Sequence, residues 1–110
     1  MNNVVKQIKE EKVLQARILV ALRAIEGCVV FAHTASPFSP TGHSDMYGSI
    51  YGCSFWAEIK LPGKKVTAIQ RAFLKQMGKE AVYKNTFVWT LVSQAVKDIK
   101  KLSKQVKENK

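Results

Sequence analysis

The sequence predicts a mixed α/β domain in which helices cover a single β-sheet. Apolar residues recur at helical spacing near both ends of the chain, and short β-branched or aromatic runs lie between these segments. The expected order is helix, three strands, helix, strand and helix, in one domain that spans residues 1–110. Hydrophobic residues make up 46% of the chain, which is enough for a core and too much for a disordered basic tail.

The first helix is predicted over residues 3–26, because a stripe recurs every three or four positions and Gly27 follows as a stop signal. The stripe comprises Ile8, Gln15, Ile18, Leu22 and Ile25, with Leu14, Leu19 and Ala21 beside it. Residues 28–32 are short, β-branched and aromatic, as buried strands are. Residues 36–42 contain two prolines and a glycine and are therefore predicted to be a loop.

Two strands of a hairpin are predicted next, over residues 45–50 and 53–60, with residues 51–52 as the turn. The Leu-Pro-Gly-Lys-Lys segment at residues 61–65 ends the second strand, and Thr67 can then cap a helix. The expected inner face of this helix comprises Ile69, Ala72, Phe73 and Met77.

The last strand is predicted over residues 86–92, followed by a Lys-rich helix over about 93–107 that Ser93 would cap. One side of this helix is apolar and comprises Val92, Ala95, Val96, Ile99 and Leu102. Its outer surface carries Lys97, Lys100, Lys101, Lys104 and Lys107. A lysine run of this kind is most often a solvated helix face.

The charge balance indicates a polyanionic partner. Eighteen Lys and Arg against eight Asp and Glu give a formal net charge of +10. Such an excess on a small domain usually serves nucleic-acid binding, and less often an anionic membrane surface. No apolar run reaches the roughly 18 residues of a membrane span, and the first residues lack a signal-peptide core. Cys28 and Cys53 are too few for a disulfide framework or a zinc finger and are expected to be reduced, which indicates an intracellular protein.

The acidic residues in the middle of the chain are few and are placed informatively. Between positions 27 and 79, only Asp45 and Glu58 are acidic. Side chains alternate along a strand, so Glu58 and Lys60 share a face, and Asp45 at the start of the neighbouring strand can lie near them. Two carboxylates beside a lysine suit Mg²⁺, and the carbonyl of Ile59 is a further oxygen ligand. The plainer interpretation is a solvated Glu-x-Lys pair and a turn aspartate.

These residues resemble the Asp…Glu-x-Lys core of the PD-(D/E)xK nucleases. Residues 58–74 resemble the VRR-NUC branch in particular, in which a Pro-Gly turn follows the Glu-x-Lys strand and the next helix carries a glutamine, here Gln70. Residues 11–15 resemble the family's opening helix, where a Glu stands four residues before a Gln. The resemblance covers residues 11–102, although His-Ser-Asp at 43–45 stands where the family usually has Val-Pro-Asp.

The resemblance implies a restriction-endonuclease-like mixed sheet flanked by helices, and a metal-dependent DNA endonuclease that hydrolyses phosphodiester bonds. The cofactor would be Mg²⁺ or Mn²⁺, and its implied ligands are Glu11, Asp45, Glu58 and the Ile59 carbonyl. Lys60 would orient the attacking water or offset charge on the transition state. Gln70 would help to hold the lysine or a substrate phosphate.

Periodicity also singles out Glu11, because it lies in register with the stripe of the first helix, where a carboxylate is costly unless it is paired or bound to metal. The alternative is that Glu11 lies in frayed first turns and faces water. The candidates for phosphate contacts that position a duplex without reading its sequence are His43, Lys64, Lys65, Arg71 and Lys75. Trp56, Phe87 and Trp89 are expected in the core rather than as base-stacking platforms.

Small stand-alone VRR-NUC proteins, which are bacterial or viral, are similar to Holliday-junction resolvases that act as homodimers. The resemblance therefore implies branched duplex DNA as the substrate, a homodimer, and a cytoplasmic location in a bacterial or virus-infected cell. A minimal domain has little room for base readout and fits structure-selective cleavage, and two-fold pairing would supply two cuts on opposite strands. The alternatives are a nonspecific or flap-type DNA nuclease, or a basic nucleic-acid-binding protein without catalysis.

Overall fold

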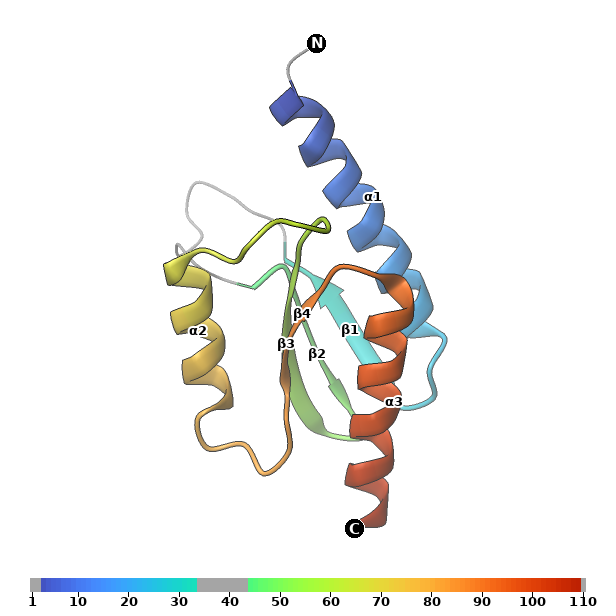
Figure 1. Ribbon diagram of the computed structural model, residues 1–110. Coiled ribbons are helices and arrows are strands. Elements are labelled where there is room, and N and C mark those ends of the chain that lie inside the picture. The colour runs from blue at the N-terminus through green and yellow to red at the C-terminus, as the bar shows by residue number, and fades with distance from the viewer. Residues whose placement is uncertain (1–2, 34–43, 110) are drawn as a thin grey trace.

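The computed structural model describes residues 3–33 and 44–109 and consists of one mixed sheet between two helical layers (Figure 1). The elements are α1 (Asn3–Arg23), β1 (Cys28–Ala32), β2 (Met46–Ile50), β3 (Cys53–Ile59), α2 (Ala68–Gly78), β4 (Thr86–Trp89) and α3 (Val92–Glu108). The predicted α/β class and element order are therefore confirmed. Within the described residues, no helix is both long and apolar enough to cross a membrane.

The four strands lie side by side in sequence order, from β1 to β4. β1 pairs with β2 and β2 with β3 in antiparallel fashion, whereas β4 runs parallel to β3. A parallel pair needs a crossover connection, which α2 supplies by packing against β3 and β4. α1 and α3 pack against each other on the opposite face of the sheet (Figure 1).

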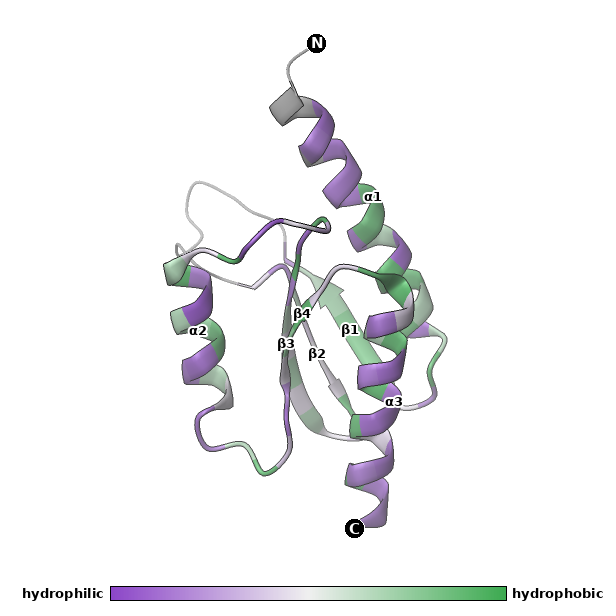
Figure 2. Ribbon diagram, viewed as in Figure 1, coloured by the Kyte–Doolittle hydropathy of each residue, from purple (hydrophilic) through white to green (hydrophobic). Residues whose placement is uncertain are grey.

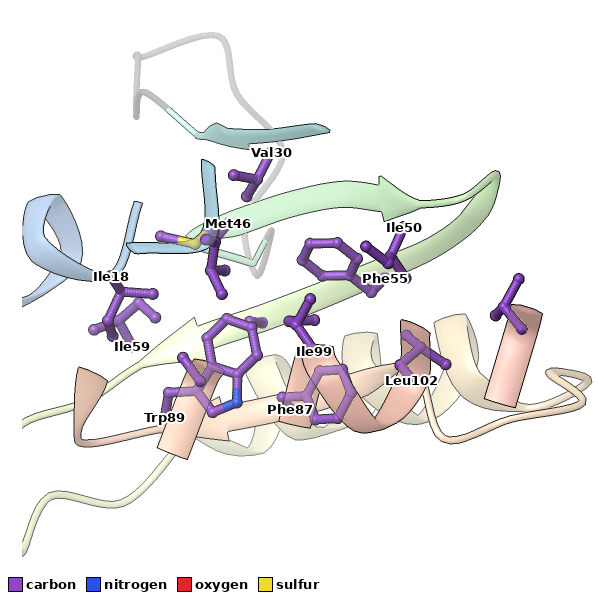
Figure 3. Packing of buried hydrophobic residues seen from close by; sticks show 14 residues of the cluster. Ile18, Val30, Met46, Ile50, Phe55, Ile59, Phe87, Trp89, Ile99 and Leu102 are labelled. Carbon is purple, nitrogen blue, oxygen red and sulfur yellow. The ribbon is translucent and has the colours of Figure 1, made fainter. Parts of the chain in front are cut away.

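The hydrophobic core lies between the sheet and the layer of α1 and α3. Its largest buried side chains include Ile18, Leu22, Ile50, Phe55, Ile59, Trp89, Ile99 and Leu102 (Figure 3). Phe87 stacks on Trp89 with ring centroids 5.2 Å apart, and the Trp89 indole N–H donates a hydrogen bond of 2.9 Å to Asp98. Both aromatic residues are core residues, as predicted. The same prediction is wrong for Trp56, which is only half-buried and lies outside the core cluster, because its position in β3 projects to the face covered by α2. Figure 2 shows that the N-terminal half of α1 and much of α3 are hydrophilic, and the five predicted outward lysines of α3 are exposed.

Two glycines let the antiparallel strands meet. Tyr51 (φ 48°) and Gly52 (φ 84°) both have positive φ, which is the conformation of the tight two-residue turn that suits a twisted hairpin. Gly48 in β2 has a different role, because a Cβ there would lie 2.1 Å from the carbonyl oxygen of Val29 in β1. The predicted hairpin turn is confirmed. The close approach of β1 additionally excludes a side chain at position 48.

Several element ends differ from the prediction. β2 begins at Met46 rather than at residue 45, and β3 ends at Ile59 rather than at residue 60. α1 ends at Arg23 rather than at residue 26, because the next amides bond to carbonyls three residues back as the chain turns toward Gly27 (φ 81°). β4 ends at Trp89 rather than at residue 92. α3 begins at Val92, so Ser93 lies inside the helix and does not cap it.

The inner face of α2 also differs from the prediction. Ile69 is 54% exposed and Ala72 is exposed, whereas Leu74 is buried and Phe73 is half-buried. The helix is rotated so that Gln70, a polar residue, faces the sheet. The prediction counted apolar residues alone and therefore placed the inner face about one residue away from its true position.

Candidate active site

Asp45 and Glu58 lie side by side at the edge of the sheet where β2 begins and β3 ends. The antiparallel register pairs Met46 with Ala57, so one further step places Asp45 opposite Glu58. Residues directly opposite each other project to the same face, with Cβ atoms about 4.5–5.5 Å apart. The Asp45 side chain is fixed by the backbone N–H of Ile59, which donates a 2.9 Å hydrogen bond to Oδ2.

Glu58 is a buried carboxyl group with one oxygen satisfied and one not. The residue is 1% exposed, and its Oε1 accepts a 2.8 Å hydrogen bond from Nε2 of Gln70. Its Oε2 is buried and accepts no hydrogen bond from the described part of the chain. A buried carboxylate oxygen without a partner is costly, so this atom calls for a proton or a cation.

The surroundings of Glu58 favour its neutral form. Burial is the main cause that raises the pKa of Glu58 from an ordinary value of 4.5 to about 9, and the adjacent Asp45 carboxylate contributes to the same rise. Lys60 acts in the opposite direction, and Glu11 makes a smaller contribution of the same sign as Asp45. Two adjacent carboxyl groups resist joint ionisation unless a positive charge enters the site. A proton on Glu58 therefore competes with any cation for this site.

Gln70 reaches Glu58 because the start of α2 fixes its amide. The Thr67 hydroxyl accepts a hydrogen bond from the backbone N–H of Gln70, and the Gln70 Oε1 accepts one from the backbone N–H of Thr67, at 3.1 and 2.9 Å. This reciprocal cap confirms Thr67 as the predicted N-cap. Since Oε1 is occupied by the cap, the amide nitrogen is directed at Glu58. Gln70 thus contacts Glu58, while its expected role of holding the lysine or a substrate phosphate stays a prediction.

Helix α1 approaches the carboxylates from the other layer. Nε2 of Gln15 donates a 3.1 Å hydrogen bond to the backbone carbonyl of Asp45. One turn earlier, Glu11 is partly buried, and burial raises its pKa, with Lys60 opposing this shift and Asp45 adding to it. The structure therefore places Glu11 beside Asp45 and Lys60, and not in the solvated position of the alternative interpretation.

Ser44 holds the backbone just before the aspartate. It is buried, and its hydroxyl donates a 3.1 Å hydrogen bond to the carbonyl of Met46, two residues later. This bond restrains the chain on both sides of Asp45 at the position where the VRR-NUC pattern has a proline. The sequence analysis did not assign this role to Ser44, because a serine in a loop has no distinctive spacing.

A pocket of about 700 Å³ opens beside Asp45, between α1, the end of β1 and the turn after β3. It combines two carboxylates, Glu11 and Asp45, with four lysines, Lys12, Lys60, Lys64 and Lys65. Its size lies within the usual range of about 300–1,000 Å³ for small-molecule sites. Lys12 was not singled out from the sequence, although its position next to Glu11 in a helix could have suggested it.

The remaining predicted site residues are Ile59, four basic residues and His43. The N–H and C=O of one strand residue point to the same side, so the Ile59 carbonyl faces the side of Asp45. Arg71 and Lys75 are exposed on α2 and do not line the pocket, whereas His43 lies outside the described residues. Lys64 and Lys65 are exposed at the rim of the pocket.

The donor set for a metal ion is small. Within residues 3–33 and 44–109, no three His, Cys, Asp or Glu side chains form a metal-binding cluster, and Glu11 as a ligand stays a prediction. Two carboxylates and a backbone carbonyl nevertheless suit Mg²⁺, which keeps several waters and takes one or two protein carboxylates together with substrate phosphate oxygens.

In comparisons with known proteins, no family model matches this chain, and no curated protein matches it.

Proposed function

We propose that this protein is a divalent-metal-dependent DNA endonuclease of the VRR-NUC type. The observation that carries the proposal is the buried Oε2 of Glu58, which has no hydrogen-bond partner in the described chain and belongs to a carboxyl group paired with Asp45. A core built only for stability would place an amide or an apolar side chain there, since an unsatisfied carboxyl group costs free energy.

The residues present fit a hard divalent cation. Asp45 and Glu58 would hold it, with the Ile59 carbonyl on the same side, and the cation would replace the proton on Glu58. Glu11 lines the same pocket and would add negative charge near Lys60 and Asp45. When bound, the ion would polarise the scissile phosphate and lower the pKa of a coordinated water.

The chain's own residues then have separate tasks. Gln70 holds Oε1 of Glu58 and so leaves Oε2 as the free oxygen. Gln15 anchors α1 on Asp45, which keeps the pocket open between the helix and the sheet end. Lys60 lines the pocket beside Asp45 and would orient the attacking water or offset the negative charge of the phosphate oxygens.

The charge distribution supports a nucleic-acid substrate. The chain carries a net charge of +10, and Lys12, Lys64 and Lys65 surround the pocket with ammonium groups that suit backbone phosphates. The resemblance to the resolvase-like VRR-NUC proteins favours branched duplex DNA cut by a homodimer. The two cysteines are free thiols, in keeping with a cytoplasmic location.

The test is cleavage of a four-way junction, a flap and a linear duplex, each with Mg²⁺, Mn²⁺ or a chelator. Asp45→Asn or Glu58→Gln should abolish cleavage while DNA binding stays intact or tightens, because each change removes a negative charge beside the phosphates. Lys60→Ala should cripple turnover and leave metal affinity, measured by calorimetry, largely unchanged. Lys104→Ala on the outer face of α3 serves as a control for lost positive charge. Wild-type cleavage by the Asp45 or Glu58 variant would refute the proposal.

A further inference from the structure

The face of the sheet that carries the carboxylates also carries a row of aromatic side chains. Asp45 and Tyr47 are two residues apart on β2 and so project to the same face. The register pairs Tyr47 with Phe31 on β1 and with Trp56 on β3. Phe31, Tyr47 and Trp56 therefore form a row directly behind the row of Asp45 and Glu58, about 6.6–6.8 Å away at the usual rise of two strand residues.

Two members of this row are exposed and touch each other. Phe31 is 48% exposed and Tyr47 is 42% exposed, and their ring centroids lie 5.7 Å apart with a tilt of 32°. Helix α2 packs against β3 and β4 on this side and half-buries Trp56. Scattered single apolar residues are normal on a protein surface, but a contacting aromatic pair beside a polar site is a patch that a ligand can use.

From this placement we infer that Phe31 and Tyr47 form a stacking platform for an unpaired nucleobase next to the scissile phosphate. The inference rests on the proposed nuclease function and narrows its substrate to DNA with unpaired nucleotides at the cleavage point. Aromatic rings stack on any base and contribute about 1–3 kcal/mol per base in single-strand-binding proteins. A fully paired duplex keeps its bases stacked inside the helix and gives the platform nothing to bind.

The charges around the platform argue for a nucleotide rather than an apolar protein surface. The platform shares its face of the sheet with Asp45, which lies one row ahead of Tyr47 and also lines the pocket. Lys60, Lys64 and Lys65 line that pocket and suit a phosphate. A nucleotide presents both a phosphate and a flat aromatic base, and this end of the sheet offers both ammonium groups and flat rings.

The experiment measures binding in chelator, so that it does not depend on hydrolysis. The probes are a splayed duplex with 2-aminopurine at the first unpaired nucleotide and a blunt duplex of the same length. Stacking on the platform should quench the 2-aminopurine fluorescence with the wild type and with Tyr47→Phe, which keeps the ring. Phe31→Ala or Tyr47→Ala should weaken binding to the splayed probe at least about fivefold, the factor that corresponds to 1 kcal/mol, and leave blunt-duplex affinity within about twofold.

The controls separate loss of the ring from loss of the fold. Tyr47→Leu keeps apolar bulk without an aromatic ring and should behave as Tyr47→Ala does, whereas Val82→Ala, at an exposed valine on the connector after α2, should change nothing. Unchanged quenching in the Phe31→Ala and Tyr47→Ala double variant would overturn the inference. It would also be overturned if these changes turned a dimer into a monomer, because a second copy would then cover the rings. Quenching that depends on Tyr47, in a protein that cleaves no DNA, would support the stacking platform and refute the nuclease function. Cleavage that depends neither on Tyr47 nor on unpaired bases would support the nuclease function and refute the platform.

Discussion

At the residue scale, the site depends on a carboxyl group that the fold does not fully satisfy. Glu58 is 1% exposed, one of its oxygens binds Gln70, and the other lies buried without a donor in the described chain. Natural proteins keep such groups mainly where function requires them, since satisfying both oxygens or removing the charge would stabilise the core. Stability and proposed activity therefore oppose each other at this position.

This opposition predicts an unusual pH dependence of stability. The pKa of Glu58 is about 9 in the folded protein and 4.5 ordinarily, so between these values the folded state holds a proton that the unfolded state has released. The stabilisation is complete below pH 4.5 and is lost as pH rises through 9, with a slope of at most about 1.4 kcal/mol per pH unit. Urea denaturation in chelator at pH 5, 7 and 9 should show this fall.

Glu58→Gln provides the control for this pH prediction, because an amide does not titrate. The variant should lose most of the pH dependence and should be more stable than the wild type near pH 9. Adding Mg²⁺ should stabilise the wild type more at high pH than at low pH, since the ion competes with the proton. An identical pH profile in wild type and variant would show that Glu58 ionises normally.

Strand periodicity predicted which carboxylates would meet, because alternation and hairpin pairing together determine which side chains share a face. It could not predict the unsatisfied Oε2 of Glu58 or the bond from Ser44 to the Met46 carbonyl. Those features depend on how closely three-dimensional neighbours approach, and no spacing in the sequence records that distance. The exposed pair of Phe31 and Tyr47 was missed for the same reason.

At the element scale, α2 joins secondary structure to the site through one side chain. Gln70 completes the cap with Thr67 and also holds Glu58, so the start of the helix and the carboxyl group are positioned together. Apolar periodicity predicted that a helix begins after Thr67 but placed Ile69 on its inner face. The polar contact at Gln70 sets the rotation of the helix, and a count of apolar residues cannot detect it.

Comparing Thr67→Ala with Gln70→Ala tests this dual role. Each variant loses one of the two hydrogen bonds of the reciprocal cap and should be less stable in urea denaturation, Thr67→Ala by about 0.5–2 kcal/mol. Only Gln70→Ala also frees Oε1 of Glu58, so only this variant should weaken Mg²⁺ binding in calorimetry, by at least severalfold. If Thr67→Ala weakened Mg²⁺ binding as much, the effect would come from the helix end as a whole and not from the bond between Gln70 and Glu58.

At the scale of the whole molecule, the net charge of +10 acts in two ways that a salt titration can separate. Long-range attraction responds to total charge, whereas direct phosphate contacts release counterions and set the salt slope, at about 0.9 per contact. Lys64→Ala and Lys65→Ala at the pocket rim should each lower the slope by about this amount. Lys104→Ala on the outer face of α3 removes the same charge and should leave the slope nearly unchanged. Equal effects of all three changes would mean that no lysine makes a dedicated contact.

Assembly is the last property that the charge and the site constrain together. One site cuts one strand, so symmetric resolution of a junction needs two sites related by a two-fold axis, and we expect an isologous dimer. Sedimentation at micromolar concentration and moderate salt, where charge repulsion is screened, should give twice the monomer mass. Paired nicks should then appear symmetrically across the branch point of a junction. A strict monomer that nicks flaps and linear duplex equally well would contradict the resolvase proposal, and the chemistry of Asp45 and Glu58 would then serve a flap-type or nonspecific nuclease.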